Sequence, residues 1–509
     1  MSLAVLYSCG LQGMHAHEVR VEVHIASGLP AFNVVGLPDA GIRESRERVR
    51  SALLCAGYEF PAARITVNLA PADLPKDSGR FDLPIALGLL LASGQLIAYD
   101  AGGKPQALQG LSEFVLVGEL SLSGAVEPVQ APLLIAAGML KQWPAKKLIL
   151  PYVSACLATH VPNLQVLGVQ SLRQAAEYLM GQASLPEIIP LPVQPDMASS
   201  LCMSDVRGQL FARRALEVAA AGGHSLLMLG TPGVGKTMLA QRLPGLLPDL
   251  NAEQTLELAA LHSLLSDVLR FTARPPFRSP HHSASVVAIV GGGSRPMPGE
   301  ISLAHHGVLF MDEFPEFERR ALEALREPLE AGVVCIARAS GRVEFPAHFQ
   351  LIAAMNPCPC GWSGHKHRTC RCTPERKQRY QQKISGPILD RIDMQIFLSD
   401  TPEQWESAPQ GEPSAIIRVR VEKARARQLE RQGRLNAALG ASGLAVYAQV
   451  DAAAEQLLGQ AMRRWQWSGR VRHRVLRLAR TLADLHESEL IQVAHLSEAM
   501  SYRQHLGLG

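Results

Sequence analysis

The 509-residue sequence lacks the features that mark membrane, secreted and disordered proteins. Its most apolar stretch, residues 83–98, is short for a membrane-spanning helix and contains Pro84 and Gln95. The N-terminus has neither the basic nor the apolar segment of a secretory signal. The nine cysteines fit no secreted disulfide scaffold of this size, and an apolar fraction of 47% argues against general disorder. These absences predict a soluble cytoplasmic protein without a membrane partner.

Lysine is also scarce, because the 50 basic residues comprise 10 Lys and 40 Arg. Arginine forms forked contacts with phosphates and carboxylates, although a GC-rich genome raises arginine content as well. The net charge of +4 is spread unevenly: −3 over residues 1–200, +3 over 201–400 and +4 over 401–509. A polyanionic partner would therefore meet the later two thirds of the chain. No single block is basic enough to prove such a partner.

Apolar patterns divide the chain into two α/β blocks and one helical block, in line with about three domains for this length. Residues 1–176 mix strands and helices, and residues 177–204, which are rich in proline, form a linker. Residues 205–400 form the second α/β block, and residues 401–509 are almost entirely helical in pattern. In the first block the pattern predicts strands at 19–25, 64–69 and 147–150 and helices at 40–57 and 82–94.

A glycine-rich segment fits the phosphate-binding pattern G-x-x-x-x-G-K-[ST] in full. An apolar strand at 224–229 precedes it and a helix at 238–243 follows, the context in which loop amides and a helix N-terminus bind phosphate. Lys236 is expected to reach the β- and γ-phosphates of ATP, and the Thr237 hydroxyl to bind Mg²⁺. The predicted nucleotide contacts are Gly230, Thr231, Pro232, Gly233, Val234, Gly235, Lys236 and Thr237.

Two later apolar strands end in residues suited to ATP hydrolysis. The strand at 307–311 leads to Asp312, which would position Mg²⁺, and to Glu313, which would polarise the attacking water as a general base. The strand at 349–355 ends at Asn356, whose amide would orient that water. A polar residue that merely begins a loop is an equally good interpretation of Asn356. Together these residues predict a Mg²⁺-dependent ATP hydrolase.

Four of the nine cysteines, Cys358, Cys360, Cys370 and Cys372, lie within 15 residues. Four thiolates suit a tetrahedral structural Zn²⁺, and disulfides are disfavoured in a reducing cytosol. The one-residue spacers are tighter than the usual two to four residues, and two histidines between the pairs could substitute as ligands. We predict a structural zinc site that folds the segment 357–373.

The order of P-loop, Asp-Glu strand, Asn-tipped strand and helical block resembles an AAA+ ATPase. More specifically, residues 277–285 (FRSPHHSAS), 291–293 (GGG), 298–305 (PGEISLAH) and 356–361 (NPCPCG) resemble the magnesium-chelatase-related ATPases of the YifB/ComM family, over essentially the whole chain. The resemblance implies a parallel-sheet AAA+ core at 205–400, a C-terminal helical lid at 401–509 and a hexameric homo-oligomer. It also implies an ATP-driven helicase that binds single-stranded or branched DNA and promotes branch migration of DNA junctions during natural transformation or recombination.

The resemblance also implies roles for two arginines at ATP. Arg391 would act as an arginine finger on the neighbouring subunit's ATP, or it would simply pair with Asp390 or Asp393. Arg470, at the start of a C-terminal helix, would sense the γ-phosphate of its own or the adjacent subunit's ATP. Four more arginines follow Arg470 on that helix.

Two segments resemble the pore loops of ring helicases. The hairpin at 333–349 would present Arg338 and Arg342 to the DNA backbone, unless they are ordinary surface residues. The insert at 275–300 would supply a second loop, with further contacts from Arg278, His281, His282 and Arg295.

The N-terminal block resembles the proteolytic domain of Lon and the related ribosomal-S5-like domain, through residues 68–77 and 118–124. This makes a Ser-Lys peptidase an alternative function. However, Arg80 stands where the nucleophile belongs, Leu133 stands near the position of the activating Lys, and Ser78 is displaced. We predict a non-catalytic domain for assembly or DNA contact. The other alternative is a protein-remodelling motor of the magnesium-chelatase type, although the sequence lacks the metal-binding integrin-like domain of such systems.

Overall fold

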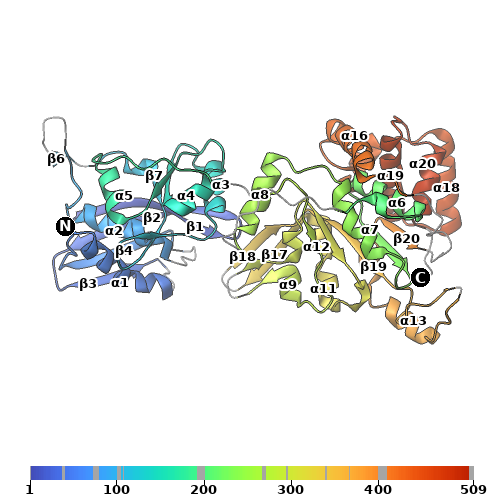
Figure 1. The fold of residues 1–509 in the computed structure, drawn as a ribbon, viewed down its shortest axis with the longest axis horizontal. Coiled ribbons are helices and arrows are strands. Elements are labelled where there is room, and N and C mark those ends of the chain that lie inside the picture. The colour runs from blue at the N-terminus through green and yellow to red at the C-terminus, as the bar shows by residue number, and fades with distance from the viewer. Residues whose placement is uncertain are drawn as a thin grey trace. The chain divides into compact units, whose positions relative to one another are not determined.

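The computed structural model describes residues 2–36, 40–72, 79–99, 105–106, 108–191, 201–265, 271–293, 296–338, 341–365, 367–398 and 410–503. The chain forms two compact units, which are coloured along the sequence in Figure 1. Unit 1 comprises Met1–Pro195, Thr255–Phe271 and Ala337–Glu344. Unit 2 comprises Asp196–Gln254, Thr272–Ile336 and Phe345–Gly509.

Unit 1 is built on a four-stranded sheet in the order β1-β2-β4-β3 (Ser2–Gln12, His15–Ala26, Arg64–Ala70, Ala31–Val35). Strand β3 is parallel to β4, and the other pairs are antiparallel. Helix α2 (Asp82–Ala92) packs on this sheet, and Gly88 makes the contact close, since a Cβ there would lie 2.6 Å from a methyl of Val23. Nearly all of α2 is buried, so the most apolar stretch of the sequence includes a core helix. The predicted strands at 19–25 and 64–69 are confirmed.

A second, parallel sheet of unit 1 has the order β11-β10-β7 (Val166–Val169, Lys147–Pro151, Phe114–Leu116). Two short hairpins accompany it: β5 with β6 (Ala98–Tyr99, Pro105–Gln106) and β8 with β9 (Glu119–Leu120, Val126–Glu127). The remaining helices of the N-terminal block are α1 (Ala40–Cys55), α3 (Pro132–Gln142), α4 (Tyr152–Ala158) and α5 (Leu172–Leu179). The helix predicted at 40–57 is therefore confirmed as α1, which ends two residues before Gly57.

Unit 2 contains a five-stranded parallel sheet in the order β13-β16-β19-β12-β20 (Phe277–Arg278, Val308–Met311, Gln350–Met355, Leu226–Gly230, Met394–Leu398). Its three central strands are buried along their whole length, as expected for a parallel sheet covered on both faces. Because all five strands run the same way, their carboxyl ends meet at one edge. That edge positions the site described below.

The chain between residues 205 and 398 also forms helices and short hairpins, of which residues 255–271 and 337–344 belong to unit 1. The helices are α6 (Leu210–Gly222), α7 (Lys236–Arg242), α8 (Ala252–His262), α9 (Val286–Val290), α10 (Glu300–Leu303), α11 (Arg319–Ala324), α12 (Arg326–Ala331), α13 (Pro374–Gln381) and α14 (Gly386–Leu389). The hairpins are β14 with β15 (Gly291–Gly292, Met297–Pro298) and β17 with β18 (Val333–Arg338, Gly341–Pro346).

The C-terminal residues form a lid of helices, drawn in orange to red in Figure 1. They are α16 (Ser414–Gln432), α17 (Ala441–Tyr447), α18 (Ala452–Trp465), α19 (Gly469–Leu485) and α20 (Val493–Ser501). Helix α19 packs on α20, and α16 and α19 pack on α6 of the core. The predicted core with a parallel sheet and the predicted helical lid are thus confirmed. None of the helices in the described ranges has both the length and the hydropathy needed to cross a membrane.

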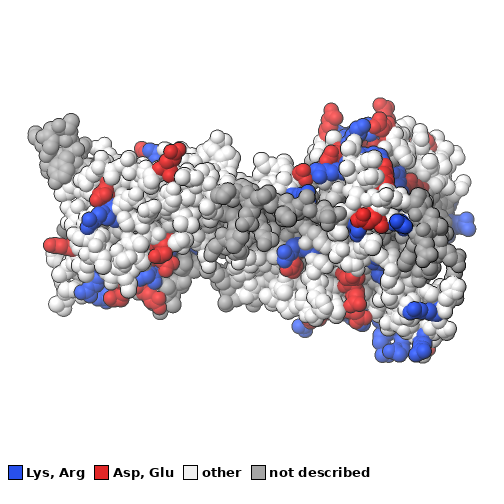
Figure 2. Space-filling view, viewed as in Figure 1, with Lys and Arg blue, Asp and Glu red and all other residues white. Residues whose placement is uncertain are grey.

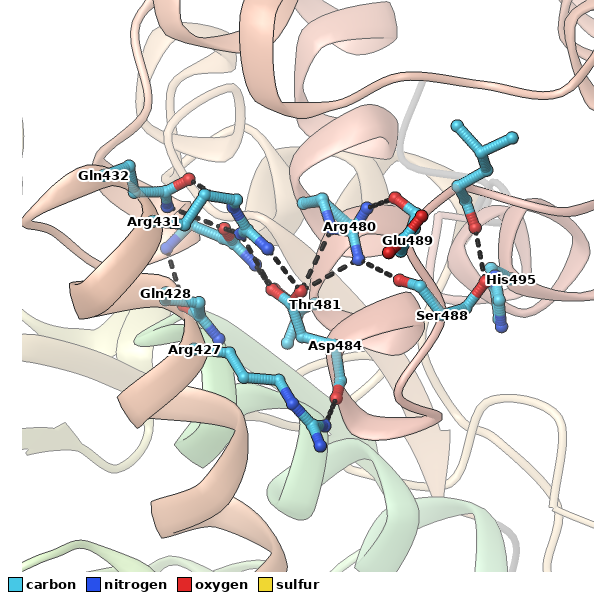
Figure 3. Close-up of polar contacts among 12 residues, drawn as sticks. Arg427, Gln428, Arg431, Gln432, Arg480, Thr481, Asp484, Ser488, Glu489 and His495 are labelled. Atoms are coloured by element: carbon cyan, nitrogen blue, oxygen red, sulfur yellow. Dashed lines mark hydrogen bonds and ion pairs between the residues drawn. The ribbon is translucent and has the colours of Figure 1, made fainter.

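A buried carboxylate, Asp484, holds the lid helices together (Figure 3). Arg431 of α16 donates both of its terminal nitrogens to Asp484, at 2.6 and 3.0 Å, and Arg480 of α19 donates at 2.9 Å. Thr481, next along α19, lies 2.7 Å from Nε2 of His224, whose Nδ1 lies 3.5 Å from Asp393. The lid is therefore joined to the core beside strand β20 by polar contacts as well as by apolar packing.

We expect Asp484→Ala to lower the free energy of unfolding by about 3–5 kcal/mol, because it removes the buried carboxylate shared by the buried Arg480 and the half-buried Arg431. Denaturant unfolding of the full chain measures the change. The matched control is Glu487→Gln, which removes an ion pair from Arg427 to a carboxylate that is 62% exposed. That change should cost no more than about 1 kcal/mol. A loss of less than 1 kcal/mol for Asp484→Ala would contradict the role given to this carboxylate.

Candidate nucleotide-binding site

The P-loop connects β12 to α7 at the carboxyl edge of the sheet. Gly233 and Gly235 have φ of +87° and +89°, a conformation that L side chains rarely adopt. With nothing within 4 Å of a Cβ at either position, the loop leaves open space on the side of these glycines. A cavity of about 550 Å³ lies there. It is lined by Pro232, Gly233, Gly235, Lys236, Thr237, Met238, Ser279, Pro280, His281, His282, Asp312, Glu313 and Asn356.

Lys236 points into the loop that precedes it. Its Nζ donates to the carbonyls of Gly230 and Thr231, at 2.7 and 2.9 Å, and to Oδ1 of Asn356, at 3.0 Å. Burial lowers the pKa of Lys236, against the opposing charges of Asp312 and Glu313. The strand-tip residue Asn356 therefore belongs to the cavity, where its amide and the ammonium of Lys236 are brought together. A phosphate oxygen entering the cavity would find a cation already oriented.

Two oxygens suited to Mg²⁺ lie side by side. The Thr237 hydroxyl donates to Oδ2 of Asp312 at 2.7 Å, so a hydroxyl and a carboxylate face the same space. Oxygen ligands of this kind are those that Mg²⁺ takes beside substrate phosphates. The hydroxyl of Thr231 in the P-loop is buried and has no hydrogen-bond partner in the described structure, which marks a polar group available to a ligand. The donor set therefore fits a Mg²⁺–nucleotide complex.

Glu313 has a strained backbone conformation. It lies in the left-handed region with φ of +51°, which is uncommon for a residue with a side chain. Its amide donates to Oδ1 of Asp312 at 2.9 Å, and its carboxylate Oε2 lies 3.1 Å from Nδ1 of His282. Strain of this kind persists where the surroundings enforce it, commonly at functional sites. Here it coincides with placement of the Glu313 carboxylate on the cavity wall.

The sequence pattern does not predict His281 and His282 as residues of the nucleotide cavity, but the structure places both on its wall. Their expected contact with DNA stays a prediction. Strand β13 lies next to β16, so the residues that follow β13 reach the same edge as Asp312 and Glu313. The sequence does show a polar segment after a short strand, but it does not show that this strand lies next to β16. His282 contacts the carboxylate of Glu313 directly.

Arg391 lies at the amino edge of the sheet, just before β20, where its carbonyl accepts a hydrogen bond from Ser225 ahead of β12, and its side chain pairs within its own chain. Its Nη2 lies 2.5 Å from Oε1 of Glu330, and its Nη1 donates to the carbonyl of Pro387 at 2.8 Å. The alternative partners considered for it, Asp390 and Asp393, are instead close to Arg474 and His224. Arg391 does not line the cavity. A role at ATP would therefore be played toward another subunit.

The arginines of α19 lie in different surroundings. Arg470 is exposed at the start of the helix, where the Ser468 side chain caps it. Arg474 is buried and lies 3.8 Å from Asp390, and burial lowers its pKa to about 10. Arg474 therefore approaches the segment around Arg391, and the charge of Arg477 also acts on Asp393 there. Arg470 is exposed, and its predicted role as a sensor of the γ-phosphate stays a proposal.

The residues predicted to contact DNA have mixed placements. Arg342 of β18 is exposed and lies 3.0 Å from Glu344. Arg338 ends β17, but its side chain lies outside the described part of the structure, as does Arg295. Arg278 donates twice to Glu300, both at 2.6 Å, so its guanidinium is engaged within the chain.

The four clustered cysteines come together in space. The Sγ atoms of Cys358, Cys360 and Cys370 lie 3.4–3.7 Å apart, and all four sulfurs, including that of Cys372, lie within 4.8 Å of one another. The amide of Trp362, opposed by burial, lowers the pKa of the Cys360 thiol to about 6. The cluster touches the nucleotide site, because a Cβ on Gly361 would lie 2.6 Å from the ring of Pro232.

The residues of the peptidase alternative are only partly described. Ser78 lies outside the described residues. Arg80, at the expected nucleophile position, is 2% exposed, and Leu133 is a buried side chain of α3.

Comparison with known proteins bears on the whole chain. The families described as "Magnesium chelatase, subunit ChlI", "Subunit ChlI of Mg-chelatase" and "Magnesium chelatase, subunit ChlI C-terminal" match residues 202–405, 21–154 and 411–503. The "Uncharacterized protein YifB" of Escherichia coli is 44% identical over 515 residues, covering 99% of this chain and 97% of that protein. The "Competence protein ComM" of Haemophilus influenzae is 44% identical over 512 residues, covering 99% and 98%.

The chain belongs to the YifB/ComM family of magnesium-chelatase-related AAA+ ATPases. Membership in this family supports hydrolysis of ATP with Mg²⁺ and an oligomeric assembly. The chain is also similar over a shorter stretch to the "DNA replication licensing factor Mcm6" of Drosophila melanogaster, which is 31% identical over 104 residues. That match covers 20% of this chain and 11% of the other protein.

Proposed function

We propose that this protein is a ring-forming, ATP-dependent DNA translocase that drives branch migration of DNA junctions during natural transformation or recombination.

 
The central observation is the convergence of Lys236, Thr237, Asp312, Glu313 and Asn356 on one cavity at the end of a parallel sheet. This is the residue set needed to bind ATP with Mg²⁺ and to activate a water molecule against it. The DNA part of the proposal is supported by two relatives, since one is named a competence protein and the other a DNA replication licensing factor.

The chain's own residues would divide the hydrolytic work. Amides of the P-loop and Lys236 would hold the β- and γ-phosphates, while Thr237 and Asp312 would hold Mg²⁺, which neutralises charge on those phosphates. Glu313 would take the proton of the attacking water, and Asn356 would help to orient that water. In a hexameric ring, Arg391 and Arg470 would act at an ATP bound between subunits. Arg338 and Arg342 of the hairpin would contact the DNA backbone.

We also propose the division of the chain that this mechanism implies. Residues 1–176 would be a non-catalytic domain and residues 177–204 a linker. Residues 205–400 would form the motor core and residues 401–509 the lid.

The test of this function is ATP turnover with and without DNA. We expect single-stranded or branched DNA to raise the ATP turnover of the wild-type protein severalfold, because a translocase couples ATP hydrolysis to movement along DNA. A Glu313→Gln variant provides the background rate. An ATP turnover that is the same with and without every DNA tested would contradict the proposal.

The second candidate is a protein-remodelling motor of the magnesium-chelatase type. It is favoured by the descriptions of all three matching families, which name a subunit of that enzyme. Such a motor would hydrolyse ATP without DNA and respond to a protein partner instead. The same turnover experiment therefore separates the two functions. The Ser-Lys peptidase is disfavoured by Arg80 and Leu133 at its expected catalytic positions.

We propose further that Cys358, Cys360, Cys370 and Cys372 bind one structural Zn²⁺. Four sulfurs within 4.8 Å of one another match the ligand set of a tetrahedral site. The ion would hold the segment after Asn356 in place against the P-loop, without taking part in chemistry.

Metal analysis of the purified protein is expected to find one zinc per chain. The double variant Cys370→Ser/Cys372→Ser should lose that zinc and should melt at a lower temperature, because the metal contributes to folding. Cys55→Ser, which alters an exposed cysteine outside the cluster, should keep both the zinc and the melting temperature. Wild-type protein that contains no zinc and exposes four titratable thiols in this segment would contradict the proposal.

A further inference from the structure

A strongly basic segment follows the strand that ends at Asn356. We define the Cys module as residues 357–383, which include the four clustered cysteines and helix α13. This module contains seven of the 50 basic residues of the chain and only one of the 46 acidic residues, Glu375. The rest of the chain therefore carries 43 basic and 45 acidic residues. The positive net charge of the whole protein is concentrated in these 27 residues.

The basic side chains of the Cys module face solvent. Arg371, Arg376 and Arg379 are exposed, and in the part of the chain that the structure describes none of them has a carboxylate partner. Arg376 and Arg379 are three residues apart on α13, so they lie on one side of that helix. Figure 2 shows blue side chains gathered at the position of α13, at the lower right of the view.

Two other contacts shape this surface. The guanidinium of Arg368 lies 4.2 Å from the ring centroid of Trp362, which holds a cation over a half-buried aromatic ring. Lys383 lies 2.8 Å from Glu316 and is thereby fixed beside α13. The other four described cations, Arg371, Arg376, Lys377 and Arg379, remain available to a ligand.

The chemistry of this surface favours a phosphodiester backbone as its ligand. Unpaired arginines form forked hydrogen bonds with phosphate oxygens, and several cations close together displace the counterions of a polyanion. An acidic protein would offer carboxylates at irregular spacing, whereas DNA offers a regular row of charges to cations at successive positions of a helix.

The Cys module is also in contact with the nucleotide site. Gly361 lies against Pro232 of the P-loop, and the buried side chain of Tyr380 on α13 lies near Asn356. A ligand on the exposed side of the module would therefore act on residues that touch the cavity on its other side.

We infer that the exposed arginines of the Cys module bind the sugar–phosphate backbone of DNA and that this contact raises ATP turnover. The inference rests on the proposed DNA translocase and adds a second DNA-binding surface to the hairpin arginines. It concerns backbone contact and carries no sequence preference, because phosphate contacts position a protein without reading bases.

The test compares two triple variants of the full chain. The first is Arg371→Gln/Arg376→Gln/Arg379→Gln. The matched control removes three exposed arginines of the lid, as Arg434→Gln/Arg463→Gln/Arg464→Gln. Binding of a labelled single strand and of a four-way junction is measured by fluorescence anisotropy at several salt concentrations. Melting temperatures establish that each variant is folded.

We expect the first variant to bind DNA on the order of tenfold more weakly, with a salt dependence reduced by roughly one unit of slope for each lost contact. Its turnover should respond less to DNA than that of the wild type. The control variant should keep the affinity. Arg371→Lys/Arg376→Lys/Arg379→Lys should keep the salt dependence but bind more weakly than the wild type, since lysine keeps the charge and loses the forked hydrogen bonds.

Two failures are distinguishable. If the wild type and the first variant bind DNA equally and with the same salt dependence, the inference is wrong while the proposed function stands, and the surface serves another partner such as an acidic protein. If the wild type binds no DNA at all, both the inference and the proposed function are overturned.

Discussion

Glu313→Gln is expected to lower ATP turnover by about 10²–10⁴-fold while leaving ATP binding nearly unchanged. The amide keeps the size and the left-handed backbone position of the side chain but cannot accept a proton from water. Binding depends instead on the P-loop and Lys236, which the substitution does not touch. Single-turnover hydrolysis and a nucleotide-binding titration measure the two effects separately.

The matched control for this variant is Glu316→Gln. Glu316 lies three residues further along the chain, is not among the residues that line the cavity, and pairs with Lys383. Its substitution should change turnover by less than about threefold, the effect expected of an exposed ion pair. If Glu313→Gln retained more than a tenth of wild-type turnover, Glu313 would not be the general base. His282, 3.1 Å from Glu313, would then be the first residue to reconsider.

Arg391→Ala is expected to reduce turnover by about 10³–10⁵-fold, the range measured for arginine fingers. The residue lies outside the cavity of its own chain, so the effect requires a neighbouring subunit. The alternative is that Arg391 only stabilises the fold through its pair with Glu330. Glu330→Gln removes that pair and leaves the guanidinium in place, so it distinguishes the two roles. A finger predicts near-normal turnover for Glu330→Gln, and a purely structural pair predicts equal losses for both variants.

Mixing experiments examine the trans arrangement directly. Arg391→Ala and Lys236→Ala should each be inactive alone, because one removes the finger and the other the phosphate-binding lysine. In a mixed ring, some sites combine an intact P-loop with an intact arginine from the neighbour. Turnover should therefore reappear on mixing. Its absence, in mixed rings shown to form, would place Arg391 outside the reaction.

The sequence predicted the parts of the site that depend on local pattern. The P-loop, the Asp-Glu strand and the strand before Asn356 each combine an apolar run with polar residues at its end, and the structure has β12, β16 and β19 at these places. The α/β class followed from the same patterns, whereas the AAA+ core and lid were implied by the family resemblance. Placement of the four cysteines close together was also expected from their spacing.

Other features of the site depend on which helices and strands are neighbours in space, and the pattern of apolar and polar residues along the sequence does not show this. His282 meets Glu313 only because β13 is the strand next to β16, an arrangement set by tertiary packing. The pair between Arg391 and Glu330 joins residues 61 positions apart, and α19 offers five arginines with identical chemistry. Only burial distinguishes Arg474 from Arg470 on that helix.

The most direct test of the account is strand exchange on a four-way DNA junction with a labelled strand. With ATP and Mg²⁺, the wild-type protein is predicted to convert the junction into its branch-migrated products, and Glu313→Gln is predicted to bind the junction without converting it. A wild-type protein that hydrolyses ATP but leaves the junction intact at every protein concentration would contradict the central claim that this AAA+ ATPase moves DNA.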